Sequence, residues 1–379
     1  MLGTTMPSPM YALYSQHLHF AVAQTTVIYA TYAGGVLAAL LIFGSWSDAI
    51  GRRPVLMAGT LCALASAVVF LNADTVAQLL VGRVLSGLSA GLFTGTATAA
   101  VIEAAPPNWR THAPAVATIA NMGGLSSGPI LAGLLVQYAP EPLRLPFVVH
   151  IVLTVLAAIA VLVVPETSPR TGKCRLQRLS VPPPVRPIFI IAGLAAFAGF
   201  AVTGLFAAVA PAFVAEVIGI DNHALAGMIA GSIFAASAAA QIVAVHIPPR
   251  RAVALGCAIL VAGMAVLAAA LHFSSLWGLI AASVVSGFGQ GISFSRGLAA
   301  VAEGTPAESR AAVNSTYFVV AYVAISIPVV GAGLAAQTWG LRASGTIFAL
   351  AVGALAALCL VAILRQESPN PADPATRVS

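Results

Sequence analysis

Charged side chains are scarce in this sequence. Of its 379 residues, 17 are Lys or Arg and 11 are Asp or Glu, whereas 59% are hydrophobic. A soluble domain carries far more charge on its surface, so this composition excludes a soluble globular protein. It indicates a chain that crosses a membrane many times.

Cysteine is also rare, and the common signatures of catalysis are missing. The four cysteines show no metal-ligand spacing, which argues against disulfides and structural zinc; they are Cys62, Cys174, Cys257 and Cys359. No glycine-rich phosphate loop precedes a lysine, and no nucleophile–base pair stands out, so ATP-driven transport and enzymatic activity find no support. We therefore expect no cofactor, no metal and no enzyme.

The basic residues indicate which loops face the cytoplasm. The apolar runs imply that thirteen of the 17 Lys and Arg lie on one side of the membrane: Arg52, Arg53, Arg110, Arg170, Lys173, Arg175, Arg178, Arg186, Arg250, Arg251, Arg310, Arg365 and Arg377. Loops on the cytoplasmic side carry such an excess. The net charge of +6 therefore indicates contact with anionic lipids, and we expect no binding to nucleic acid.

The apolar runs and one linker divide the chain. Runs long enough to cross a membrane span residues 24–43, 54–71, 76–98, 113–136, 147–164, 188–217, 224–245, 252–271, 276–300, 312–335 and 343–364. Pro165–Arg186 is rich in proline and basic residues, which is typical of a solvated linker. We predict a six-helix half over residues 1–164, a cytoplasmic linker over 165–186, a second six-helix half over 187–366 and a disordered tail over 367–379.

The first helix of the first half is incomplete in this sequence. Thr4–Tyr14 reads as the outer end of a helix, but the polar residues Ser15–His17 follow before the roughly 20 residues that a span needs. We expect the functional protein to be longer at its N-terminus by roughly 10–25 residues, enough to complete the span. The alternative is a naturally short half-span shielded by neighbouring helices.

An internal repeat relates the two halves. Residues 84–91 (VLSGLSAG) match residues 284–291 (VVSGFGQG) at a shift of 200. The same shift also aligns Glu103 with Glu303, Pro106 with Pro306, Arg110 with Arg310 and Gly133 with Gly333. Helices 4–5 and 10–11 are therefore copies in the same orientation, six spans apart. The predicted fold class is an all-α membrane protein with two parallel six-helix halves and 12 transmembrane helices, the first of them partial.

A turn with one acid and two arginines separates helices 2 and 3. It reads GSWSDAIGRRPVL over residues 44–56. Its glycines allow a tight reversal, its arginines hold it on the cytoplasmic side, and its proline suits the first turn of a helix. The stretch resembles the signature loop G-x-L-x-D-R-x-G-R-R/K of the major facilitator superfamily. It departs from that pattern at Trp46 and Ala49.

The resemblance implies a conformational latch made of Gly44, Asp48, Gly51, Arg52, Arg53 and Glu103. Asp48 would face the N-terminal end of helix 11, here Glu308–Ala312, and Arg52 would pair with Glu103. Such ties favour the outward-open form and break for inward opening. The alternative is a set of solvated charges that only fix topology, because an exposed ion pair contributes about 0–1 kcal/mol.

Arg83 falls inside the fourth predicted helix, where a charge is costly and normally faces a cavity or a partner. With Gly87 and Gly91 it resembles the family motif R-x-x-x-G-x-x-x-G. We expect it to contact a substrate anion or a proton relay; the alternative is that it reaches the outer headgroups. Arg296 falls inside the tenth predicted helix, and the same two interpretations, a functional contact or a side chain that reaches the headgroups, apply to it.

Helix 5 carries a run of small residues around a proline. Gly124, Gly128, Pro129 and Gly133 resemble the motif G-x-x-x-G-P-x-x-G-G, with Ala132 in place of one glycine. In the family this motif is associated with export by antiport. The alternative is a packing seam without directional meaning, because glycines four apart let helices approach closely.

By the same resemblance, the substrate cavity lies between the halves and is lined by helices 1, 4, 7 and 10. The candidate lining residues are Phe197, Phe200, Thr203, Phe206, Gln290 and Phe294. Such a lining suits an amphipathic or hydrophobic solute better than a sugar. None of the eleven acidic residues falls at mid-membrane. Three candidates for the proton carrier therefore remain: the missing part of helix 1, Glu216 and His150.

Together these features predict a monomeric secondary transporter of the bacterial inner membrane with both termini in the cytoplasm. We expect it to export small organic solutes in exchange for protons by alternating access. Two alternatives remain open: an importer of organic acids or sugars, and a non-transporting membrane receptor on the same fold.

Overall fold

The computed structural model describes residues 1–367, which form helices and connecting loops without a β-strand. The predicted disordered tail lies outside the described residues, apart from its first residue. In the described part of the chain, ten segments are long and apolar enough to cross a membrane. They hold α3 (Val22–Phe43), α5 (Arg52–Leu71), α6 (Val76–Ala104), α7 (Ala113–Tyr138), α8 (Leu145–Val163), α9 (Arg186–Ala212), α10 (His223–Val243), α11 (Pro249–His272), α12 (Leu276–Glu303), α13 (Arg310–Ala324) and α14 (Ile327–Glu367).

The last segment contains two crossings. A short break separates α13 from α14, and α14 itself changes direction at Gly340, whose φ of 79° lies in the left-handed region that favours glycine. The part of α14 before Gly340 completes the eleventh crossing, and the part after it forms the twelfth. This agrees with the predicted helices over residues 312–335 and 343–364.

The helical segment that precedes α3 belongs to the first predicted helix and is bent. It consists of α1 (Leu2–Thr5), the 3₁₀ turn η1 (Ser8–Met10) and α2 (Tyr11–Leu18), with Pro7 and Pro9 at the bend. Apolar side chains from this segment are fully buried in the bundle, among them Met6 and Met10 at 0% exposure. The residues predicted to be the outer part of helix 1 are thus packed as an integral part of the protein.

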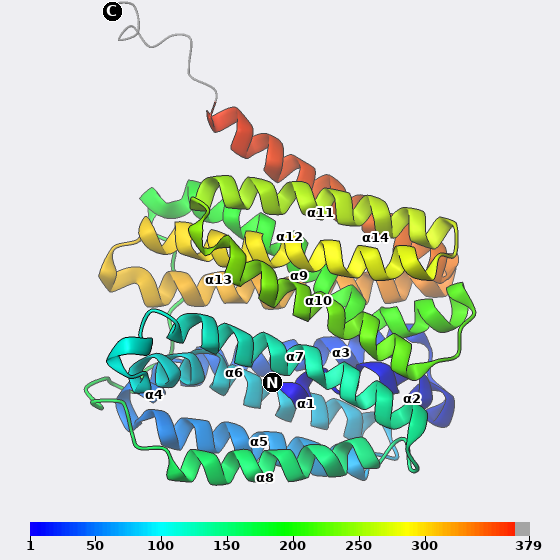
Figure 1. Ribbon diagram of the computed structural model, residues 1–379, viewed down its shortest axis with the longest axis horizontal. Helices are drawn as coiled ribbons and strands as arrows, with labels where there is room; N and C mark the ends of the chain where they lie inside the picture. Colours follow the sequence, from blue (N-terminus) through cyan, green and yellow to red (C-terminus); the bar gives the residue numbers. More distant parts are fainter. Residues whose placement is uncertain (368–379) are drawn as a thin grey trace, which may run out of the picture.

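The helices form two bundles side by side (Figure 1). One bundle holds α1 to α8 and the other holds α9 to α14. The fourth crossing, α6, begins at Val76, and the tenth, α12, begins at Leu276, so the repeat of 200 residues seen in the sequence is kept in the fold. This confirms two parallel six-helix halves.

Glycine allows the helices of a bundle to approach closely. At the crossing of α3 and α6, a Cβ added to Gly35 would lie 3.1 Å from the Cα of Gly87, and one added to Gly87 would lie 3.0 Å from the Cα of Gly35. Side-chain caps also fix where helices begin: Thr75 caps α6, Asn222 caps α10 and Ser275 caps α12.

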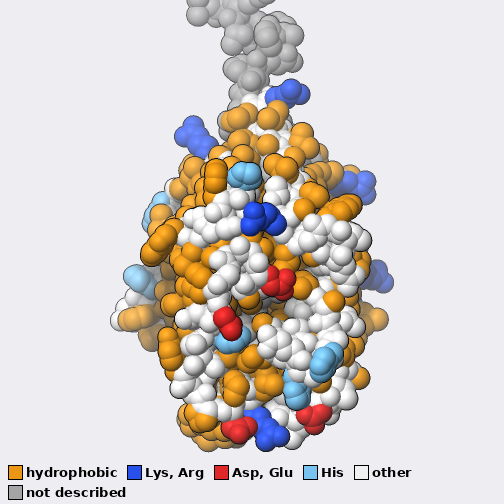
Figure 2. Space-filling model, turned by 90° about the vertical axis from the view of Figure 1, so that its right-hand side faces the viewer, with side chains coloured by type: hydrophobic (Ala, Val, Ile, Leu, Met, Phe, Trp, Pro, Cys, Tyr) orange, Lys and Arg blue, Asp and Glu red, His pale blue; other side chains and the backbone are white. Residues whose placement is uncertain are grey.

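The two ends of the molecule differ in charge. We call the end with the Gly44–Arg53 loop and the linker between α8 and α9 the basic end, and the other end the opposite end. The opposite end carries the α2–α3 and α7–α8 connections, with a few acids, arginines and histidines. Figure 2 looks onto the opposite end, where the surface is continuous across the boundary between the halves.

Close contacts join the halves toward the opposite end. The Ser126 hydroxyl on α7 donates to the Gly231 carbonyl on α10 at 3.0 Å, and the backbone N–H of His223 donates to the Gln137 side chain at 2.8 Å. On the other flank, a Cβ added to Gly333 of α14 would lie 2.2 Å from the Thr26 hydroxyl oxygen on α3. All three contacts lie in the half of the membrane-spanning region nearer the opposite end.

Candidate functional site

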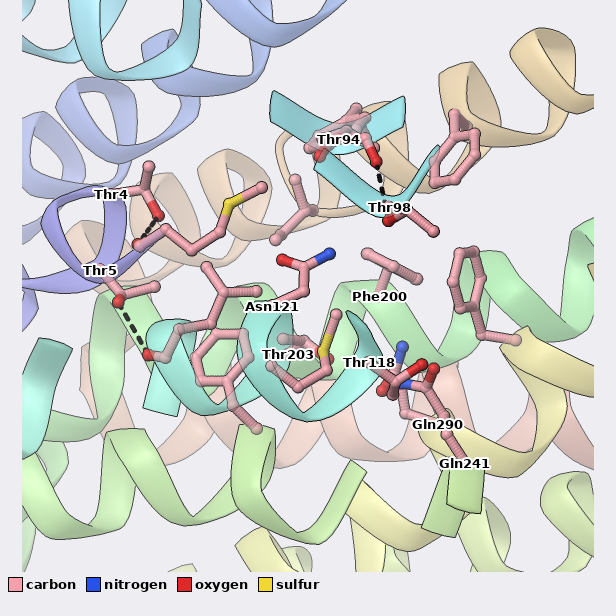
Figure 3. A pocket seen from close by; sticks show the side chains of 18 of the residues that line it. Thr4, Thr5, Thr94, Thr98, Thr118, Asn121, Phe200, Thr203, Gln241 and Gln290 are labelled. Atoms are coloured by element: carbon pink, nitrogen blue, oxygen red, sulfur yellow. Dashed lines mark hydrogen bonds between the residues drawn. The ribbon is translucent and has the colours of Figure 1, made fainter. Parts of the chain in front are cut away.

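A cavity of about 240 Å³ lies between the two halves, on the side toward the basic end. Eight helices contribute to it, namely α1, α3, α6 and α7 from the first half and α9, α10, α12 and α13 from the second. Its polar lining residues are Thr4, Thr5, Tyr29, Tyr32, Thr94, Thr98, Thr118, Asn121, Thr203, Gln241, Gln290 and Tyr322. Its apolar lining residues include Met122, Phe200, Phe234, Phe294, Leu298 and Phe318. Figure 3 shows how these side chains face one another across the cavity.

Aromatic rings form two walls of the cavity. Phe200 and Phe294 meet edge to face with ring centroids 4.9 Å apart, and Phe318 lies 5.9 Å from Phe294. Tyr32 of the first half meets Tyr322 of the second edge to face at 6.3 Å. The tyrosine pair thus bridges the halves across the cavity.

The polar groups of the cavity are already oriented. The hydroxyls of Thr94, Thr118 and Thr203 each donate to the carbonyl four residues earlier in their own helix, at 2.7 to 3.0 Å. The Gln241 amide donates to the Ser237 hydroxyl at 3.1 Å. The threonine oxygens keep acceptor capacity only, whereas the amides of Asn121, Gln241 and Gln290 can both donate and accept.

The structure brings together four of the residues predicted to line the cavity: Phe200, Thr203, Gln290 and Phe294. The others lie elsewhere. Phe206 is buried at 1% exposure in the core of the second half, and Phe197 does not line the cavity. Glu216 is exposed in the π-helical turn Phe213–Ile218 that ends α9, near the opposite end. Arg296 is half-buried on α12, and its Nε has no hydrogen-bond partner.

Several residues that line the cavity were not predicted from the sequence, because the predicted lining came from helices 1, 4, 7 and 10. Asn121 on α7, Gln241 on α10 and Tyr322 on α13 all face the cavity. A signal for α7 was present, because Thr118, Asn121 and Met122 follow the spacing of one helix face. Polar side chains at that spacing in an apolar helix indicate a face turned toward water or a solute.

Arg83 is fully buried within the first half. Its Nε donates to the Tyr11 hydroxyl and its Nη1 to the Thr4 carbonyl, both at 2.5 Å. Its guanidinium also lies over the rings of Tyr11 at 5.2 Å and Tyr29 at 5.6 Å. Its Nη2 has no partner, and no carboxylate among the described residues pairs with it. Arg83 does not line the cavity itself but stands behind Thr4 and Tyr29, which do.

His150, a candidate proton carrier, is also buried in the first half. It lies on α8 with 9% exposure. Its ring packs directly against the bent segment that precedes α3, because a Cβ added to Gly3 would come within 2.0 Å of the His150 Nε2. It does not line the cavity.

At the basic end, Arg52 is the centre of an ion-pair cluster. It makes a two-point contact with Glu103, with Nη2 to Oε1 at 2.9 Å and Nε to Oε2 at 3.2 Å. Its Nη1 lies 2.6 Å from the Asp48 carboxylate and donates to Ser47 at 2.7 Å. The pairing of Arg52 with Glu103 is therefore present. Asp48 pairs within its own half in this structure, and its tie to helix 11 stays a prediction.

Glu166, at the start of the linker, caps the helix that follows the loop. Its carboxylate accepts the backbone N–H groups of Arg52 at 2.7 Å and Arg53 at 3.2 Å, and it lies 3.5 Å from Arg170. Burial raises the pKa of Glu166, but these N–H groups, that of Ser168 and the charge of Arg170 outweigh it and hold the pKa below its ordinary value. The N-terminus of α5 is thus capped from 114 residues away.

The loop depends on glycine where this carboxylate approaches. Gly51 has a φ of 114°, and a Cβ there would lie 2.3 Å from the Glu166 Oε2. The linker then follows the loop, since the Gly172 N–H donates to the Asp48 carbonyl at 3.1 Å. Gly44 ends α3, and its N–H donates to the Leu40 carbonyl at 3.2 Å. Arg53 donates to the Leu162 carbonyl at the end of α8.

The small residues of α7 serve close packing. A Cβ at Gly128 would lie 2.4 Å from the Leu2 carbonyl oxygen, and one at Gly133 would lie 3.1 Å from the Cα of Gly227 on α10. Gly124 faces Met1. The motif therefore packs against the bent segment that precedes α3 and, across the boundary between the halves, against α10.

Two parallel helical bundles with a cavity between them identify the chain as a multi-pass membrane protein. The sequence profile of the Major Facilitator Superfamily matches residues 1–327 and 192–379. The chain belongs to this superfamily, which confirms the resemblance seen in the Gly44–Leu56 stretch.

The curated relatives include both drug-resistance proteins and a sugar-alcohol transporter. The chain is 30% identical over 115 residues to the tetracycline resistance protein, class E, of Escherichia coli, covering 30% of this chain and 28% of that protein. It is 26% identical over 196 residues to multidrug resistance protein 1 of Bacillus subtilis, covering 51% and 50%. It is 30% identical over 151 residues to myo-inositol transporter 1A of Cryptococcus neoformans, covering 40% and 26%. The chain thus spans half or less of the length of these relatives.

A solved structure supports the fold over the whole chain. The xylose transporter XylE from E. coli, in a partially occluded inward open conformation, matches with a TM-score of 0.69 and covers 97% of this chain and 96% of that one. The identity is 13%, so this likeness concerns the fold alone.

Proposed function

We propose that the protein is a secondary active transporter that exports small organic solutes in exchange for protons by alternating access. The observation that carries the proposal is the position of the cavity. It lies between two parallel halves, toward the basic end, while the close contacts between the halves lie toward the opposite end. A cavity at the interface of two halves that can rock is the arrangement that alternating access requires.

The charges support an orientation. Lys and Arg concentrate at the basic end, so by the positive-inside rule this end faces the cytoplasm of a bacterium whose inner membrane holds the protein. Both termini and the linker are then cytoplasmic, and the cavity described here belongs to the inward-facing state. We further propose the limits 1–164 and 187–366 for the two halves, and a monomer whose basic end contacts anionic lipids.

Export is favoured by two observations. The relatives include a tetracycline resistance protein and a multidrug resistance protein. The lining also combines aromatic rings with isolated amides and hydroxyls, which suits an amphipathic solute. Import of a polyol or sugar is the second candidate, because one relative is named a myo-inositol transporter.

Proton exchange requires a titratable group that meets the transport pathway. Among the described residues, no Asp or Glu lines the cavity. Glu216, at the end of α9, is the acid that we propose takes up the proton from the outside. We assign Arg83 to coupling, because a buried guanidinium behind Thr4 and Tyr29 would respond to changes in the charge of the cavity.

A substrate-panel screen tests the proposal. Cells with and without the protein are exposed to a panel of small organic solutes, and intracellular solute is measured. An exporter lowers it and an importer raises it. Flux in proteoliposomes is then measured against an imposed pH gradient. Export that follows the proton gradient supports the full proposal, whereas binding without net flux would favour a receptor.

A further inference from the structure

We infer that the cavity binds an uncharged aromatic solute that carries hydroxyl or N–H groups, and that Asn121 is its polar anchor. This deepens the proposed function, on which it rests for the identity of the cavity as the substrate site. It adds the chemical class of the solute and the residue that selects it.

Asn121 is the least satisfied polar group of the cavity wall. Its Oδ1 is shielded from solvent and accepts no hydrogen bond from any described residue. The side chain lies on α7 between Thr118 and Met122 and points into the space between the halves (Figure 3). A buried carbonyl oxygen without a donor destabilises the folded state. Rotation of the amide would turn this oxygen toward the cavity, where a bound solute with an O–H or N–H group would supply the missing donor.

Other polar groups of the cavity lining also favour a solute that donates hydrogen bonds. The hydroxyls of Thr94, Thr118 and Thr203 give their single protons to backbone carbonyls, so these residues offer a solute only oxygen lone pairs. A solute that only accepts hydrogen bonds would leave these oxygens unpaired. A solute with several donors would satisfy them.

Charge is disfavoured in both signs. The side chains that line the cavity are uncharged, so a cation would lose its water without gaining a carboxylate. The guanidinium of Arg83 would repel it further, since it contacts the Thr4 carbonyl and the Tyr29 ring directly behind the wall. An anion would be attracted by Arg83 but could not pair with it, because Arg83 lies behind the wall and no described Lys, Arg or His side chain lines the cavity. An uncharged solute avoids both costs.

Aromatic rings supply the apolar contact. Phe200, Phe294 and Phe318 form a continuous edge-to-face cluster on one wall, with successive ring centroids 4.9 and 5.9 Å apart. A planar ring system would pack against this cluster in the offset or edge-to-face arrangements that aromatic pairs prefer. The donors on its rim would then reach the Asn121 amide and the threonine oxygens.

Binding to the purified full chain in lipid nanodiscs tests the inference. Four naphthalene probes are compared by titration calorimetry at pH 7: 2,7-dihydroxynaphthalene, 2,7-dimethoxynaphthalene, 2-naphthoate and 2-naphthyltrimethylammonium. Empty nanodiscs correct for partition into lipid. We expect the dihydroxy probe to bind at least tenfold more tightly than the other three, because it alone is an uncharged donor.

Two substitutions locate the anchor. Asn121→Ala should weaken binding of the dihydroxy probe about tenfold and leave the dimethoxy probe unchanged. Asn314→Ala is the matched control, because the Asn314 Oδ1 is also buried without a partner but Asn314 does not line the cavity. Asn121→Asp should instead create binding of the ammonium probe, and Asn314→Asp should not.

The inference is overturned if the naphthoate or ammonium probe binds the natural chain as tightly as the dihydroxy probe, or if none of the four binds. It is also overturned if Asn121→Ala binds the dihydroxy probe as the natural chain does. If Asn121→Ala fails to fold, the four probes on the natural chain and the binding of the ammonium probe to Asn121→Asp still test the inference. A charged solute that shows net flux would refute this inference and leave the proposed transport intact; absence of net flux for every solute would refute transport itself.

Discussion

At the scale of single residues, the basic-end loop depends on positions where a side chain has no room. Gly51 combines a left-handed φ with a carboxylate oxygen 2.3 Å from where its Cβ would be. Gly34 on α3 lies in the same half, and a Cβ there would meet nothing within 4 Å. The two glycines therefore form a matched pair for substitution.

Gly51→Ala should destabilise the protein by about 1–3 kcal/mol, because alanine is strained at that φ and its methyl group displaces the Glu166 cap. Gly34→Ala should leave the melting midpoint nearly unchanged. Thermal unfolding of the two variants in detergent measures the difference. Equal midpoints would mean that the approach of Glu166 to Gly51 does not hold the loop.

Arg83→Ala should abolish transport or its coupling to protons, and Arg83→Lys should restore it only in part. The guanidinium bonds Tyr11 and Thr4 with two different nitrogens, and a lysine ammonium cannot reproduce that planar geometry. Flux is compared at equal amounts of monodisperse protein. Full flux through the alanine variant would show that Arg83 is dispensable for transport.

At the scale of elements, the start of α5 is stabilised by the distant carboxylate of Glu166. The lowered pKa of Glu166 means that its ionised form stabilises the folded state. This contribution is complete above its ordinary pKa of 4.5 and is lost as the pH falls through the lowered folded-state pKa. Stability should therefore decline in acid in part through this one group.

Glu166→Gln should lower the melting midpoint at pH 7 and flatten its decline below about pH 4.5, because the amide does not titrate. Melting midpoints of the natural chain and the variant are measured from pH 7 to pH 3. Glu308→Gln serves as control, since Glu308 is exposed and forms no ion pair among those of the described residues. Parallel curves for the natural chain and Glu166→Gln would rule out the proposed cap.

The helices could be predicted from sequence because membrane length and apolar composition determine them locally. The repeat predicted that the two halves have the same orientation, and α6 and α12 do begin at equivalent residues. The pairing of Arg52 with Glu103 followed from the resemblance. The cap on α5 could not be foreseen, because Glu166 lies more than 100 residues along the chain. Asn121 was missed because the cavity lining was assigned to helices 1, 4, 7 and 10, while one face of helix 5 also lines the cavity.

At the scale of the whole molecule, the contacts toward the opposite end hold the present conformation. Gly227 on α10 packs against Pro129 and Gly133 on α7, and a Cβ there would lie 2.2 Å from the Pro129 carbonyl oxygen. Gly331 on α14 has nothing within 4 Å of its added Cβ. A larger side chain at Gly227 would therefore separate the halves at this end.

Gly227→Leu should shift the protein toward a form that is open at the opposite end, whereas Gly331→Leu should not. Spin labels at positions 141 and 221, exposed loop residues of the two halves, report the separation in a background without the native cysteines. The distance distribution should lengthen in Gly227→Leu. An unchanged distribution would mean that this seam does not control the opening.

Counterflow in proteoliposomes tests alternating access most directly. Vesicles with the purified protein are preloaded with unlabelled solute from the substrate screen, and entry of the same labelled solute is followed without a pH gradient. We predict transient accumulation of label above its equilibrium level, because one cavity must carry solute in alternate directions. Saturable binding of label with no accumulation above equilibrium would contradict alternating access and leave a receptor as the better description.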